Sequence, residues 1–239
     1  MGIFVFINPV FIFQSGWFGS DIAFTAFLTS ALVFFWIGLE KSKGLYLFVG
    51  GAFLCASLFS KQTAIVSLVP ILLLALLYRP NFWSVFCAFL GGFSFLLCLS
   101  LSHGLFTGDY VRFLDPEELI KFLERFNSQL GEDRERLPAS PTYLTVISEY
   151  FPAIIAILAG TLQIASISLT KGVAALSSNH RLALVFLITG LAIIGIHELM
   201  HLYYRGLSLW PRYLSPASTF ICLSFIIYIT PNINAMVDA

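Results

Sequence analysis

The chain has 239 residues, of which 58% are hydrophobic and 11% are charged, and its mean hydropathy is +0.89. Soluble domains carry about 25% charged residues, so this composition excludes a soluble protein and predicts an all-α, multi-pass integral membrane protein. The formal net charge is zero, and we expect the lipid bilayer, and no nucleic acid, as a partner. The four cysteines lie in apolar runs without a CxxC pair, which is typical of small core residues.

The chain begins with an apolar segment, Ile3–Phe13, that is too short to span a bilayer and is interrupted by Asn8-Pro9. It starts at Met1 with no charged region before it and has no small-residue cleavage site, so it is not typical of a signal peptide. We interpret it as a partial helix: either the end of a helix whose beginning is missing, or a half-helix at the membrane interface.

The apolar runs that follow predict about seven transmembrane helices within a single membrane domain, residues 1–239. At 1.5 Å per residue, such runs and their polar flanks match a hydrocarbon core of roughly 30 Å. Glycine pairs at Gly50-Gly51 and Gly91-Gly92 permit close helix approach in lipid. The predicted crossings are Ile22–Leu39, Leu45–Phe59, Thr63–Tyr78, Phe82–Leu101, Phe151–Leu169, Leu182–Leu202 and Tyr213–Ile229.

A long outer loop, residues 103–150, separates the fourth and fifth predicted crossings. Nine of the thirteen acidic residues lie between Asp109 and Glu149, which indicates an aqueous loop. Asp115-Pro116 is typical of a helix start, and apolar residues at helical spacing follow it. We therefore predict an amphipathic surface helix over residues 115–130. The pattern fits a shielding connector and a substrate-gating element equally well.

Basic residues in the short loops predict the orientation. Five on one face against three on the other favour the first face as cytoplasmic, although counting the long loop reverses the bias. The first group is Lys41, Lys43, Arg79, Lys171 and Arg181, and the second is Lys61, Arg205 and Arg212. The favoured orientation brings Asp21, Lys61 and the Glu198–Arg212 region to the non-cytoplasmic surface.

Asp21 stands at the start of the first long apolar run. A carboxylate at the mouth of a helix bundle is costly to desolvate, which favours a functional role. Ser20 or Asp21 can equally cap the helix, because an acidic side chain suits that end of the helix dipole.

The segment His197-Glu198-Leu199-Met200-His201 matches the HExxH pattern of zinc proteases. On a helix, His197 and His201 would share one face and bind zinc, with Glu198 as general base. A catalytic zinc site needs a third protein ligand, and the only carboxylate after His201 is Asp238. The simpler interpretation is that these polar side chains line an aqueous site near the end of a helix.

The order of several short motifs resembles the multi-spanning glycosyltransferases of the C superfamily, relatives of the protein O-mannosyltransferases and of the transferases that move aminoarabinose onto lipid A. The resemblance covers roughly Asn8 to Ile229 and rests on order and spacing. Its motifs are Asn8-Pro9, Ser20-Asp21 before an apolar helix, Ser60-Lys61-Gln62 and Arg212-Tyr213-Leu214-Ser215-Pro216.

The resemblance implies sugar transfer from a polyprenyl-phosphate donor at the outer or lumenal membrane face. Asp21 would act as general base toward the acceptor. Lys61, Arg212 and, less directly, Arg205 would stabilise the departing lipid phosphate, and Tyr213 would line the site together with the 197–201 segment. Without the resemblance, Lys61 and Arg212 are typical of residues anchored at the membrane interface.

The resemblance leaves several points open. Relatives usually carry a further acidic residue in a large loop after their first helix, and nothing before Asp21 matches it, so we expect a fragment-like chain that is either truncated or inactive. Some relatives use a divalent metal and others do not, and the acceptor is not identified. The location would be the plasma membrane in a bacterium or an endoplasmic-reticulum-type membrane in a eukaryote. A non-catalytic membrane subunit is the third alternative, beside the transferase and the zinc protease.

Overall fold

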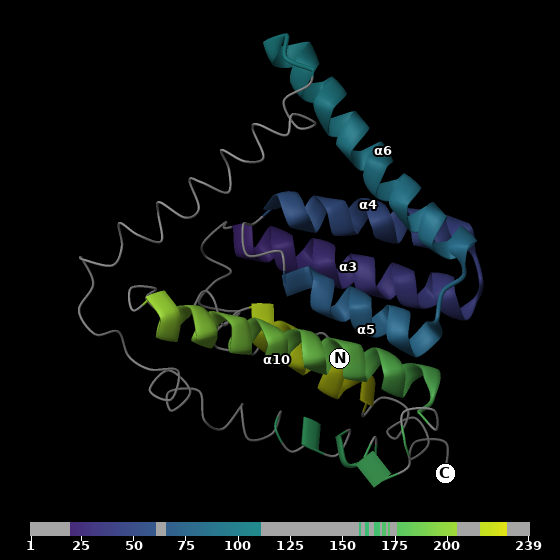
Figure 1. Ribbon diagram of the computed structural model, residues 1–239, viewed down its shortest axis with the longest axis vertical. Helices are drawn as coiled ribbons and strands as arrows, with labels where there is room; N and C mark the ends of the chain where they lie inside the picture. Colours follow the sequence, from purple (N-terminus) through teal and green to yellow (C-terminus); the bar gives the residue numbers. More distant parts are fainter. Residues whose placement is uncertain are drawn as a thin grey trace.

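The computed structural model describes residues 20–60, 66–110, 176–204 and 216–228, together with residues 158, 161–162, 165–167, 169–170 and 172. The described chain is helical and contains no strand, as the composition predicts (Figure 1). The helices are α3 (Ser20–Glu40), α4 (Gly44–Ser60), α5 (Leu68–Tyr78), α6 (Phe82–Thr107), α10 (Ser178–Tyr204) and a C-terminal helix, Pro216–Tyr228. The N-terminal partial helix and the 115–130 helix lie outside the described residues.

Three helices are long and apolar enough to cross a membrane by length and composition: Ile22–Glu40, Phe82–Thr107 and Ser178–Ile196. This confirms the prediction of an α-helical membrane protein. The helices α4, α5 and Pro216–Tyr228 are apolar but shorter. The 11 residues of α5 extend only about 16 Å at 1.5 Å per residue.

The start of α5 has a local cause in the sequence. The apolar run begins at Thr63, but the α-helix begins at Leu68, which places Pro70 in its first turn. Proline is tolerated there because the first-turn N–H groups have no partner within the helix. In contrast, α6 is longer than predicted: it continues past the predicted end at Leu101 to Thr107. Its C-cap is Gly108, whose backbone is left-handed with φ of 78°.

Two tight turns join the first four described helices in pairs, α3 to α4 and α5 to α6. Between α3 and α4, Ser42 has a left-handed backbone with φ of 51°, and the Lys43 N–H donates to the Gly38 carbonyl at 3.0 Å. Between α5 and α6, the Arg79 N–H donates to the Ala75 carbonyl at 2.9 Å. The Asn81 side chain then accepts from the Ser84 N–H at 2.9 Å and caps α6.

The helices α4 and α6 cross with their backbones in close contact. A Cβ atom built on Gly51 would collide with the Ala88 carbonyl oxygen, and one built on Gly91 would collide with the Phe48 carbonyl oxygen. Only glycine allows two helices to approach this closely. Away from the crossing, α6 diverges from the other helices (Figure 1), and much of its apolar surface is exposed.

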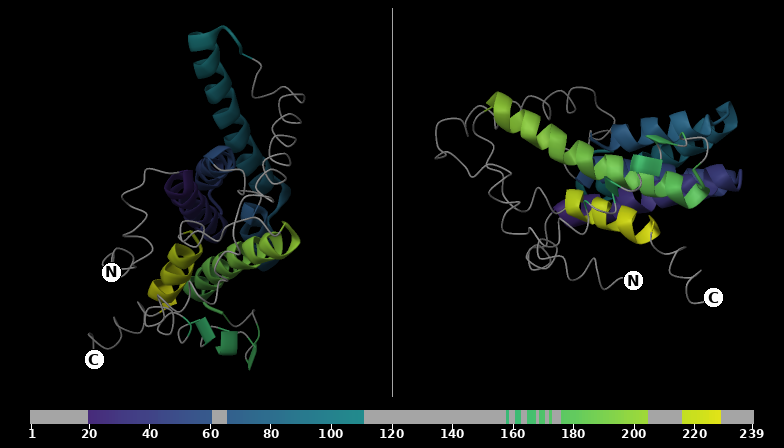
Figure 2. Two further views of the ribbon diagram at one scale, coloured as in Figure 1. Left: turned by 90° about the vertical axis from the view of Figure 1, so that its left-hand side faces the viewer. Right: turned by 90° about the horizontal axis from the view of Figure 1, so that it is seen from below.

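The buried core lies between α3, α5, α10 and the C-terminal helix, which lies beside α10 (Figure 2). Leu28 and Leu32 are fully buried there, and the rings of Phe186 and Phe220 stack at 5.9 Å. The buried Ser224 hydroxyl donates to the Ala183 carbonyl at 2.6 Å, which joins the C-terminal helix to α10. The core therefore unites segments from both halves of the sequence.

The close crossing predicts that a single methyl group destabilises the bundle. Gly51→Ala and Gly91→Ala are each expected to lower the free energy of unfolding by about 1–3 kcal/mol, because one backbone must move away from the other. The measurement is a denaturation titration of the purified protein in detergent.

Gly92→Ala is the matched control. Its new methyl group would meet the Gly51 carbonyl oxygen at 3.5 Å, an ordinary contact, and alanine has a higher helix propensity than glycine. We expect its stability to equal or slightly exceed that of the wild type. Equal effects of all three substitutions would contradict the close crossing.

Candidate functional site

Three helix termini lie at one end of the bundle, which we call the Asp21 end: the start of α3 and the last turns of α4 and α10 (Figure 1). The backbone of Asp21 is in the first turn of α3, directly after Ser20. That position suits a carboxylate because the N-terminal end of a helix dipole is positive.

The side chains of the candidate residues are outside the described part of the structure. This applies to Asp21 and to His197, Glu198 and His201, whose backbone belongs to α10. The helical backbone of α10 extends through Tyr204, so it has the conformation that an HExxH motif needs. The other candidates lie wholly outside the described residues: Lys61, Arg205, Arg212 and Tyr213.

The opposite end of the bundle, which we call the basic end, comprises residues 40–43, 78–81 and 177–181. Its polar side chains connect three helices that are distant in sequence. The Tyr78 hydroxyl donates to Glu40 Oε1 at 2.8 Å, and the Arg181 guanidinium lies 5.6 Å from the centroid of the Tyr78 ring. The Trp36 indole N–H donates to Ser178 Oγ at 2.9 Å across 142 positions of sequence.

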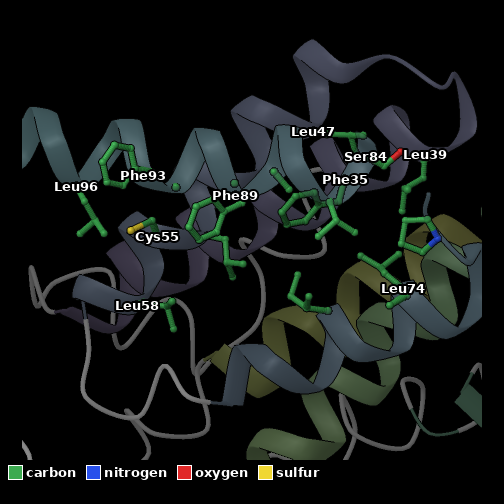
Figure 3. Close-up of a pocket in the computed structure, with 18 residues that line it drawn as sticks. Phe35, Leu39, Leu47, Cys55, Leu58, Leu74, Ser84, Phe89, Phe93 and Leu96 are labelled. Carbon is green, nitrogen blue, oxygen red and sulfur yellow. The ribbon is translucent and has the colours of Figure 1, made fainter. Parts of the chain in front are cut away.

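A large apolar cavity of about 550 Å³ lies between α5 on one side and α4 and α6 on the other (Figure 3). Such a volume is typical of small-molecule sites, which span about 300–1,000 Å³. Within the lining, Ser84 carries the only side-chain oxygen and Cys55 the only sulfur. The remaining lining residues are Phe35, Leu39, Leu47, Gly51, Leu54, Leu58, Ile71, Leu74, Ala75, Pro80, Val85, Ala88, Phe89, Gly92, Phe93 and Leu96.

The chemistry of this lining restricts what can bind. A charged cofactor would lose its hydration without gaining hydrogen bonds, whereas a hydrocarbon chain would lose nothing. Among the described residues, no group of three or more His, Cys, Asp or Glu side chains could hold a metal ion. The described structure therefore offers a site for an apolar chain.

Sequence reasoning did not identify this cavity. Its signal was present only indirectly, in the glycine pairs that predict a close helix approach. The cavity forms because α6 is in close contact with α4 at Gly51 and Gly91 and lines the cavity opposite α5 with Phe89 and Phe93. The angle between helices depends on side-chain packing across the crossing, which hydrophobic periodicity does not record.

No protein-family model, curated protein or solved structure matches the chain. The functional argument consequently rests on the geometry and on the residues themselves.

The network at the basic end predicts a measurable contribution to stability. Tyr78→Phe is expected to lower the free energy of unfolding by about 0.5–1.5 kcal/mol, because it removes the hydroxyl that donates a hydrogen bond to Glu40. In a double-mutant cycle with Glu40→Ala, the two substitutions should be non-additive by a similar amount.

Tyr46→Phe is the matched control for Tyr78→Phe. The Tyr46 ring stacks on Phe34 at 6.2 Å, and its hydroxyl has no hydrogen-bond partner among the described residues. Its substitution should leave stability unchanged. Additive effects of Tyr78→Phe and Glu40→Ala would mean that the hydrogen bond does not stabilise the bundle.

Proposed function

We propose that the protein is a membrane glycosyltransferase that moves a sugar from a polyprenyl-phosphate donor to an acceptor at the membrane surface formed by the Asp21 end. The observation that carries the proposal is that three helix termini lie on the same side of the bundle (Figure 1). The first turn of α3 contains Asp21, and the last turns of α4 and α10 directly precede Lys61 and Arg205. One carboxylate and two cations would thus approach a single substrate.

The reaction needs these two types of group. An acceptor hydroxyl or amine loses a proton as it attacks the anomeric carbon, and the Asp21 carboxylate would accept that proton. The bond from the anomeric carbon to the phosphate oxygen breaks, and negative charge develops on the departing lipid phosphate. Lys61 and Arg212 would stabilise that charge, the latter through a two-pronged contact.

We also propose that the chain crosses the membrane seven times. The directions of the described helices support this count. Successive helices α3, α4 and α5 run alternately between the Asp21 end and the basic end, and α6 starts at the basic end. Since α10 also starts at the basic end, one return crossing between α6 and α10 is needed, and the predicted run is Phe151–Leu169.

The proposal predicts that the Asp21 carboxylate is essential for transfer. With membranes containing the protein and a radiolabelled polyprenyl-phosphate sugar, Asp21→Asn is expected to lower the transfer rate at least about 100-fold, as for the loss of a general base. Asp109→Asn, at an exposed position after α6, is the matched control and should transfer at the wild-type rate.

Two outcomes would contradict the proposal. An unchanged rate for Asp21→Asn would remove the role given to this carboxylate. Absence of transfer by the wild-type chain would favour the non-catalytic membrane subunit.

The zinc protease alternative keeps one supporting observation, the helical backbone around His197–His201. It predicts one zinc ion per chain, lost in a His197→Ala, His201→Ala double variant, as measured by metal analysis of the purified protein. The glycosyltransferase proposal predicts no such loss from that variant. The two functions are therefore separated by one measurement.

A further inference from the structure

The cavity between α5 and the α4–α6 pair extends along the helices. Its lining on α4 runs from Leu47 to Leu58, a distance of about 16 Å at 1.5 Å per residue. The helices α3 and α6 that contribute to it are long and apolar enough to span a bilayer. A groove of this length and chemistry, at membrane depth, fits one extended hydrocarbon chain.

One end of the cavity reaches the basic end of the bundle. Leu39 lines it from the last turn of α3, Pro80 from the α5–α6 turn, and Ser84 from the first turn of α6 (Figure 3). Ser84 therefore places the cavity's one hydroxyl at this end, which we call the mouth of the cavity. Phe82 and Trp83, both largely exposed, stand at the same level, where aromatic residues typically meet the lipid headgroups.

Three basic residues are close in sequence to the residues that line this end of the cavity. Lys41 and Lys43 follow Leu39 in the α3–α4 turn, and Arg79 directly precedes Pro80; all three are exposed. Among the described residues, none of the three has an ion-pair partner. The one described carboxylate at this end, Glu40, accepts a hydrogen bond from Tyr78 at 2.8 Å.

The helix dipoles contribute little to this charge. Of the four helices that line the cavity, α4 and α6 begin at the basic end, at Gly44 and Phe82, while α3 and α5 end there, at Glu40 and Tyr78, so the positive and negative ends of the dipoles offset one another. An anionic group there would be attracted by the basic side chains. The neutral headgroup of a zwitterionic lipid would gain much less.

We propose that this groove binds an anionic phospholipid of the bilayer, with one acyl chain between α5 and α6 and its phosphate beside Lys41, Lys43 and Arg79. The Ser84 hydroxyl would donate to an ester or phosphate oxygen of the lipid. The lipid would fill the cavity between α5 and α6 and so stabilise the angle at which α6 leaves the core.

This site is independent of the proposed transferase chemistry. The donor phosphate in that reaction would lie at the Asp21 end, whereas the lipid phosphate here lies at the basic end. The two sites therefore have different headgroup positions, and loss of one leaves the other intact. A polyprenyl phosphate in the groove is the competing occupant that the experiment must exclude.

The test measures lipid retention by native mass spectrometry after the purified protein is exchanged into nanodiscs of equal parts phosphatidylglycerol and phosphatidylcholine. The wild type is expected to retain phosphatidylglycerol in preference to phosphatidylcholine by at least about fivefold. Each of Lys43→Gln and Arg79→Gln should lower that preference about fivefold, the factor expected for one basic residue near an anionic membrane surface.

A second pair of variants tests the groove itself. Ala75→Trp places a large ring in the cavity at an exposed position and should abolish retention. Leu76→Trp is the matched control: it is the next residue, it is 75% exposed, and it does not line the cavity. It should retain lipid as the wild type does.

Three results would overturn the proposal. They are equal retention of the two phospholipids by the wild type, undiminished retention by Ala75→Trp, and displacement of phosphatidylglycerol by equimolar undecaprenyl phosphate. The last would assign the groove to a polyprenyl chain. Thermal melting of each variant in the same nanodiscs controls for folding, because all four altered side chains are exposed and should leave the melting temperature within a few degrees of the wild type.

Discussion

The contact between the backbones of α4 and α6 is the constraint on which the rest of the described structure depends. Glycine at positions 51 and 91 lets each helix touch a carbonyl group of the other. Because both helices are rigid, this one crossing sets the direction of α6 and its distance from α5. The apolar cavity, the exposed face of α6 and the position of Ser84 at the cavity mouth all follow from it.

The bundle has two chemically different ends, and helix direction alone separates them. Tight turns with left-handed residues at Ser42 and Arg79 reverse the chain between α3 and α4 and between α5 and α6, so basic turns collect at one end. There they surround hydrogen bonds such as the one between Tyr78 and Glu40. The backbone of Asp21 lies at the other end, where α4 and α10 end. The proposed lipid phosphate recognition and the proposed transfer chemistry thus concern opposite ends of the bundle.

The sequence predicted the helices that the structure describes, because long apolar runs in a chain with few charges have no stable alternative in lipid. The count of seven crossings stays a prediction. The sequence also predicted the close approach at the glycine pairs. It did not predict that α5 begins only at Leu68, with Pro70 in its first turn. Nor did it predict the hydrogen bond from Trp36 to Ser178, which are 142 residues apart in the sequence. The cavity was missed for the same reason: it depends on how two helices cross, which a single segment does not encode. The roles of Asp21, Lys61 and Arg212 stay predictions.

The most direct test of this account is the sidedness of the two ends in a sealed membrane. In a variant with its four native cysteines replaced by alanine, Ser20→Cys and Ser42→Cys would be labelled separately with a membrane-impermeant maleimide, before and after the vesicles are opened. The account predicts that the two cysteines react from opposite sides of the membrane. Reaction of both from the same side would contradict a helix α3 that spans the bilayer between the Asp21 end and the basic end.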